Sequence, residues 1–130
     1  MNALAGIRVL DLTQYIAGPY CTKLLADFGA DVLKIERPPA GDPARRLGPF
    51  PNDTPHLETS APFLHLNTNK RSLTLNLKTE EGRRIALRLA ERADVLVENF
   101  RPGTLARLGL DVNELHARNP RLIVTSISNF

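Results

Sequence analysis

Hydrophobic and polar positions in the first part of the chain predict a strand, a helix and a second strand. Residues 7–12 and 32–36 are runs rich in Val, Ile and Leu, which is typical of buried strands. The intervening segment "PYCTKLLADFG" has apolar positions at helical spacing and should bury Leu24, Leu25 and Phe28. A strand–helix–strand unit of about thirty residues predicts two parallel strands joined by a crossover helix.

The second half of the chain continues the same alternation. In "NKRSLTLNLK", Leu73, Leu75 and Leu77 alternate with polar residues, which predicts a strand with one buried face. Thr79 can cap a helix over residues 80–93. Further elements are predicted as a strand over the apolar run 95–97, short helices at 104–108 and 112–117, and a strand at 121–128. This order predicts an α/β fold with a mainly parallel sheet and flanking helices.

Residues 37–62 have a different composition, with seven of the ten prolines and no convincing periodicity. A compact domain rarely contains so long a connection without regular structure unless it binds something or wraps a partner. We therefore expect a long Pro-rich loop with one of these roles. A flexible insertion is the alternative.

Polar side chains follow several of the predicted strands. In "DVLVENFRPG", a buried run ends in Glu98, Asn99, Phe100 and Arg101 before a Pro-Gly turn. Ligands of parallel α/β sheets bind beyond the carboxyl ends of the strands, so these residues lie at the expected binding edge. The same edge should contain Gln14, Glu36, Arg37, Asn76, Lys78 and, one turn further on, Arg107. Four cations among amides and carboxylates favour a small ligand with several phosphates, because guanidinium groups match phosphate oxygens in pairs.

The individual residues allow simpler interpretations. Arg37 and Lys78 could be ordinary surface residues, and Phe100 could belong to the core. No Gly-x-Gly-x-x-Gly or Gly-Lys-Ser/Thr motif follows an early strand, which disfavours a standard dinucleotide or P-loop site. The hypothesis of a binding edge therefore depends on the coincidence of these residues rather than on any one of them.

Composition and charge narrow the function classes. The 130 residues suffice for one domain, and the formal charge is only +3. Thirteen of the seventeen cations are Arg, scattered rather than interleaved with aromatics, so nucleic acid is not an expected partner. Cys21 is the single cysteine, which leaves no disulfide framework and no metal-ligand spacing. Without a secretion signal or a long apolar run, the chain is predicted to be cytoplasmic, with no membrane contact.

Four ordered motifs resemble those of the family III CoA-transferases. They are "LAGIRVLDLTQYIAGPYCTKLLADFGADVLKIERP", "NKRSLTLNLKTEEGR", "ADVLVENFRPGTLARLGLD" and "NPRLIVTSIS", and they span nearly the whole chain. That family includes formyl-CoA transferase, the carnitine CoA-transferases and the α-methylacyl-CoA racemases. The resemblance implies a Rossmann-like unit that binds coenzyme A, with acyl-CoA and a carboxylic acid as substrates and no permanently bound cofactor. It also implies an interlocked homodimer for the full-length family protein.

The resemblance assigns specific CoA contacts. They are Ile16, Ala17, Arg37, Leu75, Asn76, Leu77, Lys78, Asn99, Phe100, Arg101 and Arg107. Arg37 and Lys78 match positions near the phosphates. Ile16 stands where formyl-CoA-type members commonly have Gln, which puts formyl or oxalate specificity in doubt.

The resemblance places no catalytic residue within the chain. The family's transferases use an Asp that forms an acyl anhydride and then a CoA thioester, and its racemases use a His and an Asp. These residues are expected beyond Phe130, in a region with a second domain. We therefore expect residues 1–130 to be the CoA-binding part of a CoA-transferase and to be inactive alone. A racemase-type isomerase and a non-catalytic CoA-binding module are the alternatives.

Overall fold

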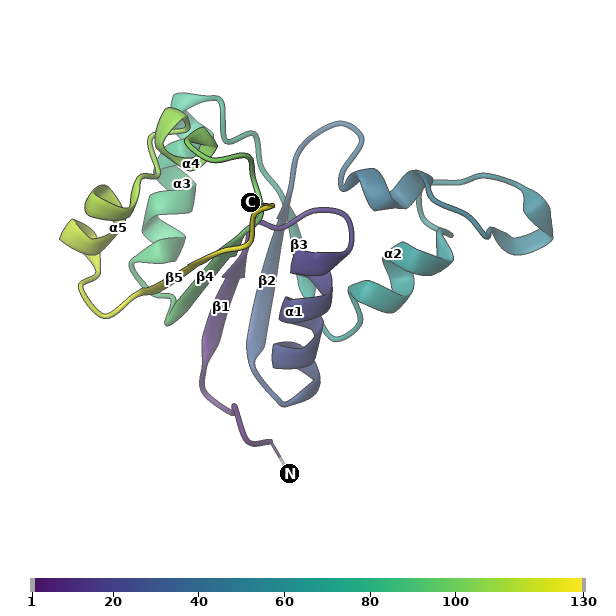
Figure 1. The fold of residues 1–130 in the computed structure, drawn as a ribbon, viewed down its shortest axis with the longest axis horizontal. Coiled ribbons are helices and arrows are strands. Elements are labelled where there is room, and N and C mark those ends of the chain that lie inside the picture. The colour runs from purple at the N-terminus through teal and green to yellow at the C-terminus, as the bar shows by residue number, and fades with distance from the viewer. Residues whose placement is uncertain (1, 130) are drawn as a thin grey trace.

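The computed structural model describes residues 2–129, which form an α/β unit around one central sheet (Figure 1). The strands are β1 (Arg8–Asp11), β2 (Asp31–Glu36), β3 (Arg71–Thr74), β4 (Val95–Glu98) and β5 (Ile123–Ser126). They lie in the order β3-β2-β1-β4-β5, and each neighbouring pair is parallel. The predicted class is confirmed, and this strand order is that of Rossmann-like sheets.

Helices cover both faces of the sheet. They are α1 (Ala17–Asp27), α2 (Ala61–Leu66), α3 (Glu80–Ala90), α4 (Thr104–Arg107) and α5 (Val112–Arg118), with 3-10 turns η1 (Pro43–Arg46) and η2 (Pro51–Asp53). Figure 1 shows α1 on one face and the group of α3, α4 and α5 on the other. Side chains alternate along β1, so Val9 packs with the α1 side and Leu10 with the α3 side. Among residues 2–129, no helix has the length and apolar content that a membrane crossing requires.

The prediction for the buried face of α1 is wrong in part. Leu24 is 40% exposed and Phe28 is 57% exposed. The face that contacts the sheet is made instead of the small residues Gly18, Thr22 and Ala26, which recur every fourth position. Small side chains let the helix approach the sheet closely, so Leu24 and Phe28 point outward, whereas Leu25 packs against the core as predicted.

The third strand is shorter than predicted. It ends at Thr74, and Leu75 N–H donates to Glu36 O at 2.8 Å as the chain leaves the sheet. Leu73, Leu75 and Leu77 nevertheless pack against the core, as their alternation predicts. The period of two therefore identified the buried face correctly but overestimated the length of the strand.

Residues 37–62 are not a structureless loop. They contain η1 and η2 and continue into the start of α2, a helix that the sequence did not predict. Asp42, Ala44 and Ser60 of this segment are buried. Ser60 Oγ lies 2.8 Å from Ala44 O and 2.6 Å from Leu47 O, and it also caps α2 by accepting from Phe63 N–H. Side-chain hydrogen bonds rather than an apolar pattern therefore order this segment, which explains why periodicity did not find it.

Candidate ligand-binding cleft

A cleft of about 620 Å³ opens at the carboxyl edge of the sheet. Its walls come from the end of β2, the residues that follow β1, β2 and β3, and the segment from β4 to α4. Seven of the predicted CoA contacts line it, namely Arg37, Leu75, Asn76, Leu77, Lys78, Phe100 and Arg101. The fold therefore brings together residues from three segments that are far apart in the sequence.

Three cations face this cleft without an ion-pair partner. Within residues 2–129, every ion pair is formed by groups other than Arg37, Lys78 and Arg101. All three are exposed, and the cleft also has apolar wall residues such as Leu12 and Ile35. Free cations beside an apolar wall suit a ligand that combines phosphate groups with a less polar chain.

The other four predicted contacts lie around this cleft rather than in its lining. Ile16 and Ala17 are exposed at the start of α1, just after Gln14, which does line the cleft. Arg107 lines an adjacent cleft of about 580 Å³, and Lys78 borders both clefts. The Arg107 guanidinium donates to Thr104 Oγ1 at 2.8 Å.

Asn99, the fourth of these, uses its side chain within the protein. Its Oδ1 accepts from Gln14 N–H at 2.8 Å, and its Nδ2 donates to Gln14 O at 2.7 Å. Glu98 behaves similarly: it is buried, and its Oε2 accepts from Phe100 N–H at 2.8 Å. The four residues at the end of β4 that the sequence analysis selected therefore have two different roles. Phe100 and Arg101 face the cleft, whereas Glu98 and Asn99 hold the backbone.

Glu36, also predicted at the binding edge, has a structural role. Arg45 binds both of its carboxylate oxygens at 2.8 Å, and Asp42 N–H and Ser72 Oγ donate to the same group. Burial alone would raise the pKa of Glu36, but the contacts from Arg45, Asp42 and Ser72 outweigh it and hold the pKa at about 2. Arg45 also stacks 3.7 Å from the centroid of the Phe63 ring. This cluster fastens the Pro-rich segment to β2.

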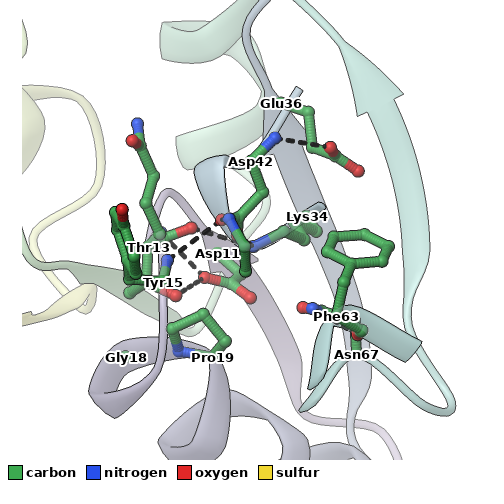
Figure 2. Close-up of polar contacts among 12 residues, drawn as sticks. Asp11, Thr13, Tyr15, Gly18, Pro19, Lys34, Glu36, Asp42, Phe63 and Asn67 are labelled. Carbon is green, nitrogen blue, oxygen red and sulfur yellow. Dashed lines mark hydrogen bonds and ion pairs between the residues drawn. The ribbon is translucent and has the colours of Figure 1, made fainter. Parts of the chain in front are cut away.

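A second buried polar network lies under the turn from β1 to α1 (Figure 2). Lys34 and Asp42, almost fully buried, form an ion pair at 2.8 Å. Asp11 and Lys70 form another at 3.1 Å, and Lys70 also donates to Pro19 O at 3.0 Å. Burial lowers the pKa of Lys70, and the nearby Asp11 charge opposes that effect.

Sequence reasoning missed this network, although one signal was present. Asp11 and Lys34 interrupt the apolar runs "VLDL" and "VLKIE" of strands that were predicted to be buried. A charge in a buried strand is costly unless it is paired, so each implied a partner elsewhere in the fold. The partners, Asp42 and Lys70, carry no pattern that identifies them. In the part of the chain that the structure describes, no His, Cys, Asp and Glu cluster could hold a metal ion.

Comparison with known proteins shows the family to which the sequence is similar. CoA-transferase family III matches residues 4–130 of the chain. The succinyl-CoA:mesaconate CoA-transferase of Haloarcula marismortui is 52% identical over 130 residues, covering 100% of this chain and 33% of its own length. The formyl-CoA:oxalate CoA-transferase of Bradyrhizobium sp. is 48% identical, covering 99% of this chain and 29% of its own length.

Solved structures agree in fold. A CAIB/BAIF family protein from Brucella suis matches with a TM-score of 0.89 and 42% identity, covering 99% of this chain and 34% of its own. The protein Rv3272 from Mycobacterium tuberculosis matches with a TM-score of 0.88 and 42% identity, covering 99% and 35% respectively. The chain thus spans about a third of the length of its relatives. On the match over residues 4–130 and the identity to these relatives, the chain belongs to CoA-transferase family III.

Proposed function

We propose that the cleft at the carboxyl edge of the sheet binds the coenzyme A portion of an acyl-CoA. The observation that carries this proposal is the set of three free cations, Arg37, Lys78 and Arg101, around one partly apolar cleft. Coenzyme A joins a highly phosphorylated nucleotide to a long pantetheine chain, so it needs cationic and less polar surfaces side by side. Arg107 lines the adjacent cleft, which shares Lys78 with this one, so it is positioned to extend the cationic surface.

The proposed activity is the transfer of coenzyme A from an acyl-CoA to a carboxylic acid. The named relatives act on succinyl-CoA and mesaconate or on formyl-CoA and oxalate, which supports this class of reaction. In the proposal, the chain supplies the CoA-binding part, and the Asp that forms the anhydride and thioester is none of its residues. The acting protein is an interlocked homodimer in the cytoplasm.

The binding proposal is tested by titrating coenzyme A calorimetrically into the natural protein. Replacing both Arg37 and Lys78 by Ala should weaken binding by about 2–4 kcal/mol, taking ~1–2 kcal/mol per charge-assisted contact. The matched control replaces Arg88 and Arg92, two exposed arginines outside the cleft lining, by Ala. Equal losses in the two double variants would mean that net charge, and not this cleft, attracts the ligand.

The activity is tested by incubating the protein with an acyl-CoA and an isotopically labelled acid. A transferase moves label into the new thioester without exchanging the α-proton of the acyl group. A racemase, the alternative within the family, instead incorporates deuterium at that carbon in heavy water and moves no label. A protein that binds coenzyme A but does neither is a binding module. Light scattering on the same preparation tests the dimer.

A further inference from the structure

The turn between β1 and α1 is held by side chains from distant parts of the chain. Thr13 N–H donates to Asp11 Oδ1 at 2.9 Å, and Thr13 O accepts from Lys34 Nζ at 2.9 Å. Figure 2 shows Asp11 of β1, Lys34 of β2 and Asp42 of the Pro-rich segment close together beside Thr13. Gly18 packs against the same turn so closely that an added Cβ would lie 2.3 Å from Thr13 Cβ. The turn is therefore held by hydrogen bonds from Asp11 and Lys34 and by close packing against Gly18 of α1.

Asn99 holds the backbone of Gln14, the residue after Thr13. The main-chain ladder between β1 and β4 ends where Leu12 N–H donates to Val97 O at 2.9 Å. One step further on, the Asn99 amide takes the place of a backbone peptide, accepting from Gln14 N–H and donating to Gln14 O. The side chain thus adds one rung to the ladder after the strands have separated, and its oxygen and one of its two N–H groups pair with Gln14.

Asp42 holds the backbone of Tyr15, the residue after Gln14. Its Oδ1 accepts from Tyr15 N–H at 3.0 Å, and its Oδ2 lies 2.8 Å from Lys34 Nζ. Tyr15 has a φ of 71°, in the left-handed region that a non-glycine residue rarely adopts. Such a conformation persists only when the surroundings impose it, and the contact with Asp42 is one that does so.

We propose that Asn99 and Asp42 are positioning residues that hold the 13–16 turn in the shape that receives the acyl-CoA. The turn lies beside the cleft: Gln14 lines it, and Ile16 is exposed at the start of α1. Asn99 and Asp42 act through the backbone of this turn and do not touch the ligand. This inference rests on the proposed function, and it differs from the direct CoA contact that the family resemblance assigns to Asn99, which stays a prediction for the test below to decide.

Asn99→Asp provides a sharp test, because a protonated carboxyl group has the same donor and acceptor arrangement as the amide. Above its pKa, the ionised carboxylate loses the donor to Gln14 O and repels that oxygen. At pH 8 we expect Gln14 N–H exchange in the ligand-free natural protein to be about tenfold faster than in the wild type, and coenzyme A affinity about tenfold weaker. At pH 4 both ratios to the wild type should fall to about two, because a tenfold effect corresponds to a rise of about one unit in the pKa of the new carboxyl group above the usual value of ~3.9.

Two controls accompany this variant. Asn113→Asp makes the same chemical change at an exposed position of α5 and should alter neither ratio. Asn99→Leu removes the amide permanently, so its losses should not recover at pH 4. Recovery in the Asp variant alone identifies the hydrogen-bond pattern, rather than the bulk of the side chain, as the cause.

The role of Asp42 is tested in variants that remove the charges of both Lys34 and Asp42, because a single substitution would leave one buried charge unpaired and destabilise the fold. Lys34→Met/Asp42→Asn keeps an acceptor for Tyr15 N–H, whereas Lys34→Met/Asp42→Ala does not. We expect the Ala combination to bind coenzyme A about tenfold more weakly than the Asn combination, with faster exchange of Tyr15 N–H. Equal affinities in the two double variants would overturn the role of Asp42.

The outcomes separate this inference from the proposed function. Loss of affinity in Asn99→Asp without faster exchange at Gln14 would mean that Asn99 contacts the ligand, which overturns the inference. Faster exchange with unchanged affinity would mean that the shape of the turn does not matter for binding, which also overturns it. A wild-type protein that fails to bind coenzyme A would overturn the proposed function and the ligand part of this inference. The exchange comparison would still decide whether Asn99 holds the turn.

Discussion

Replacing Lys34 by Met should destabilise the fold by about 3–5 kcal/mol, because it leaves the carboxylate of Asp42 buried without its partner. Lys34 Nζ lies 2.8 Å from Asp42 Oδ2 and donates to Thr13 O at 2.9 Å. Both charged side chains are almost completely shielded from water. A methionine of similar length fills the space but replaces neither the charge nor the donor.

The magnitude follows from the geometry of the pair. At 2.8 Å, two unit charges attract by roughly 6 kcal/mol if the effective dielectric constant is about 20. The cost of removing both charges from water offsets much of this attraction, so the pair as a whole contributes little. Removing one partner forfeits the attraction while the other charge stays buried, and the freed Thr13 carbonyl adds about 1 kcal/mol.

The double variant Lys34→Met/Asp42→Asn separates these effects. Asn at position 42 carries no charge, but it keeps an acceptor for the N–H groups of Tyr15 and Ala44, which Asp42 Oδ1 binds at 3.0 and 2.9 Å. We expect the double variant to lose only about 1–2 kcal/mol, mainly from the unpaired Thr13 carbonyl. The double variant should therefore be about 2–3 kcal/mol more stable than Lys34→Met alone.

Urea unfolding of the natural protein, Lys34→Met and the double variant, followed by circular dichroism, measures this difference in unfolding free energy. Equal losses in Lys34→Met and in the double variant would refute the reasoning, because the charge on Asp42 would then carry no cost. A change in the slope of the unfolding curve would have to be checked first, since it signals a change in the unfolded state rather than in the pair.

Two further changes follow from close contacts and from charge. Gly18→Ala should lower the unfolding free energy by at least about 2 kcal/mol, because the added Cβ would lie 2.3 Å from Thr13 Cβ. An unchanged midpoint of thermal unfolding would contradict this expectation. Arg45→Met should raise the pH of acid unfolding. The stabilisation from Glu36, whose pKa is held at about 2, is complete above its usual pKa near 4.5 and disappears as the pH falls towards 2. Without Arg45 most of that stabilisation is already missing at neutral pH, so the less stable protein unfolds at a higher pH during acidification. The exposed neighbour Arg46→Met should leave the acid transition in place, and identical transitions in the two variants would disprove the assignment.

The sequence predicted the sheet well because its signal is local. Alternating apolar runs with Val and Ile mark strands, and a parallel sheet places their carboxyl ends at one edge. That reasoning brought Arg37, Lys78 and Arg101 to one edge, and the structure places them on one cleft. The same reasoning could not say which polar groups at the edge face the ligand and which hold the backbone.

That distinction depends on contacts between residues far apart in the chain. Asn99 and Gln14 are 85 positions apart, and nothing in the motif "ENFRPG" reveals that the amide pairs with a backbone peptide of another loop. Likewise, Leu24 and Phe28 show helical spacing, but only the small residues on the opposite side of α1 decide which face meets the sheet. Periodicity gives the element, and tertiary packing chooses its face.

Hydrogen exchange measured with and without coenzyme A tests the central claim most directly, because it reports where the ligand sits. The account predicts slower exchange, on saturation with coenzyme A, in residues 37–40, 75–78 and 100–104, with no change in the distant segment 51–58. Protection confined to other segments, or no protection at saturating ligand, would contradict a coenzyme A site in this cleft.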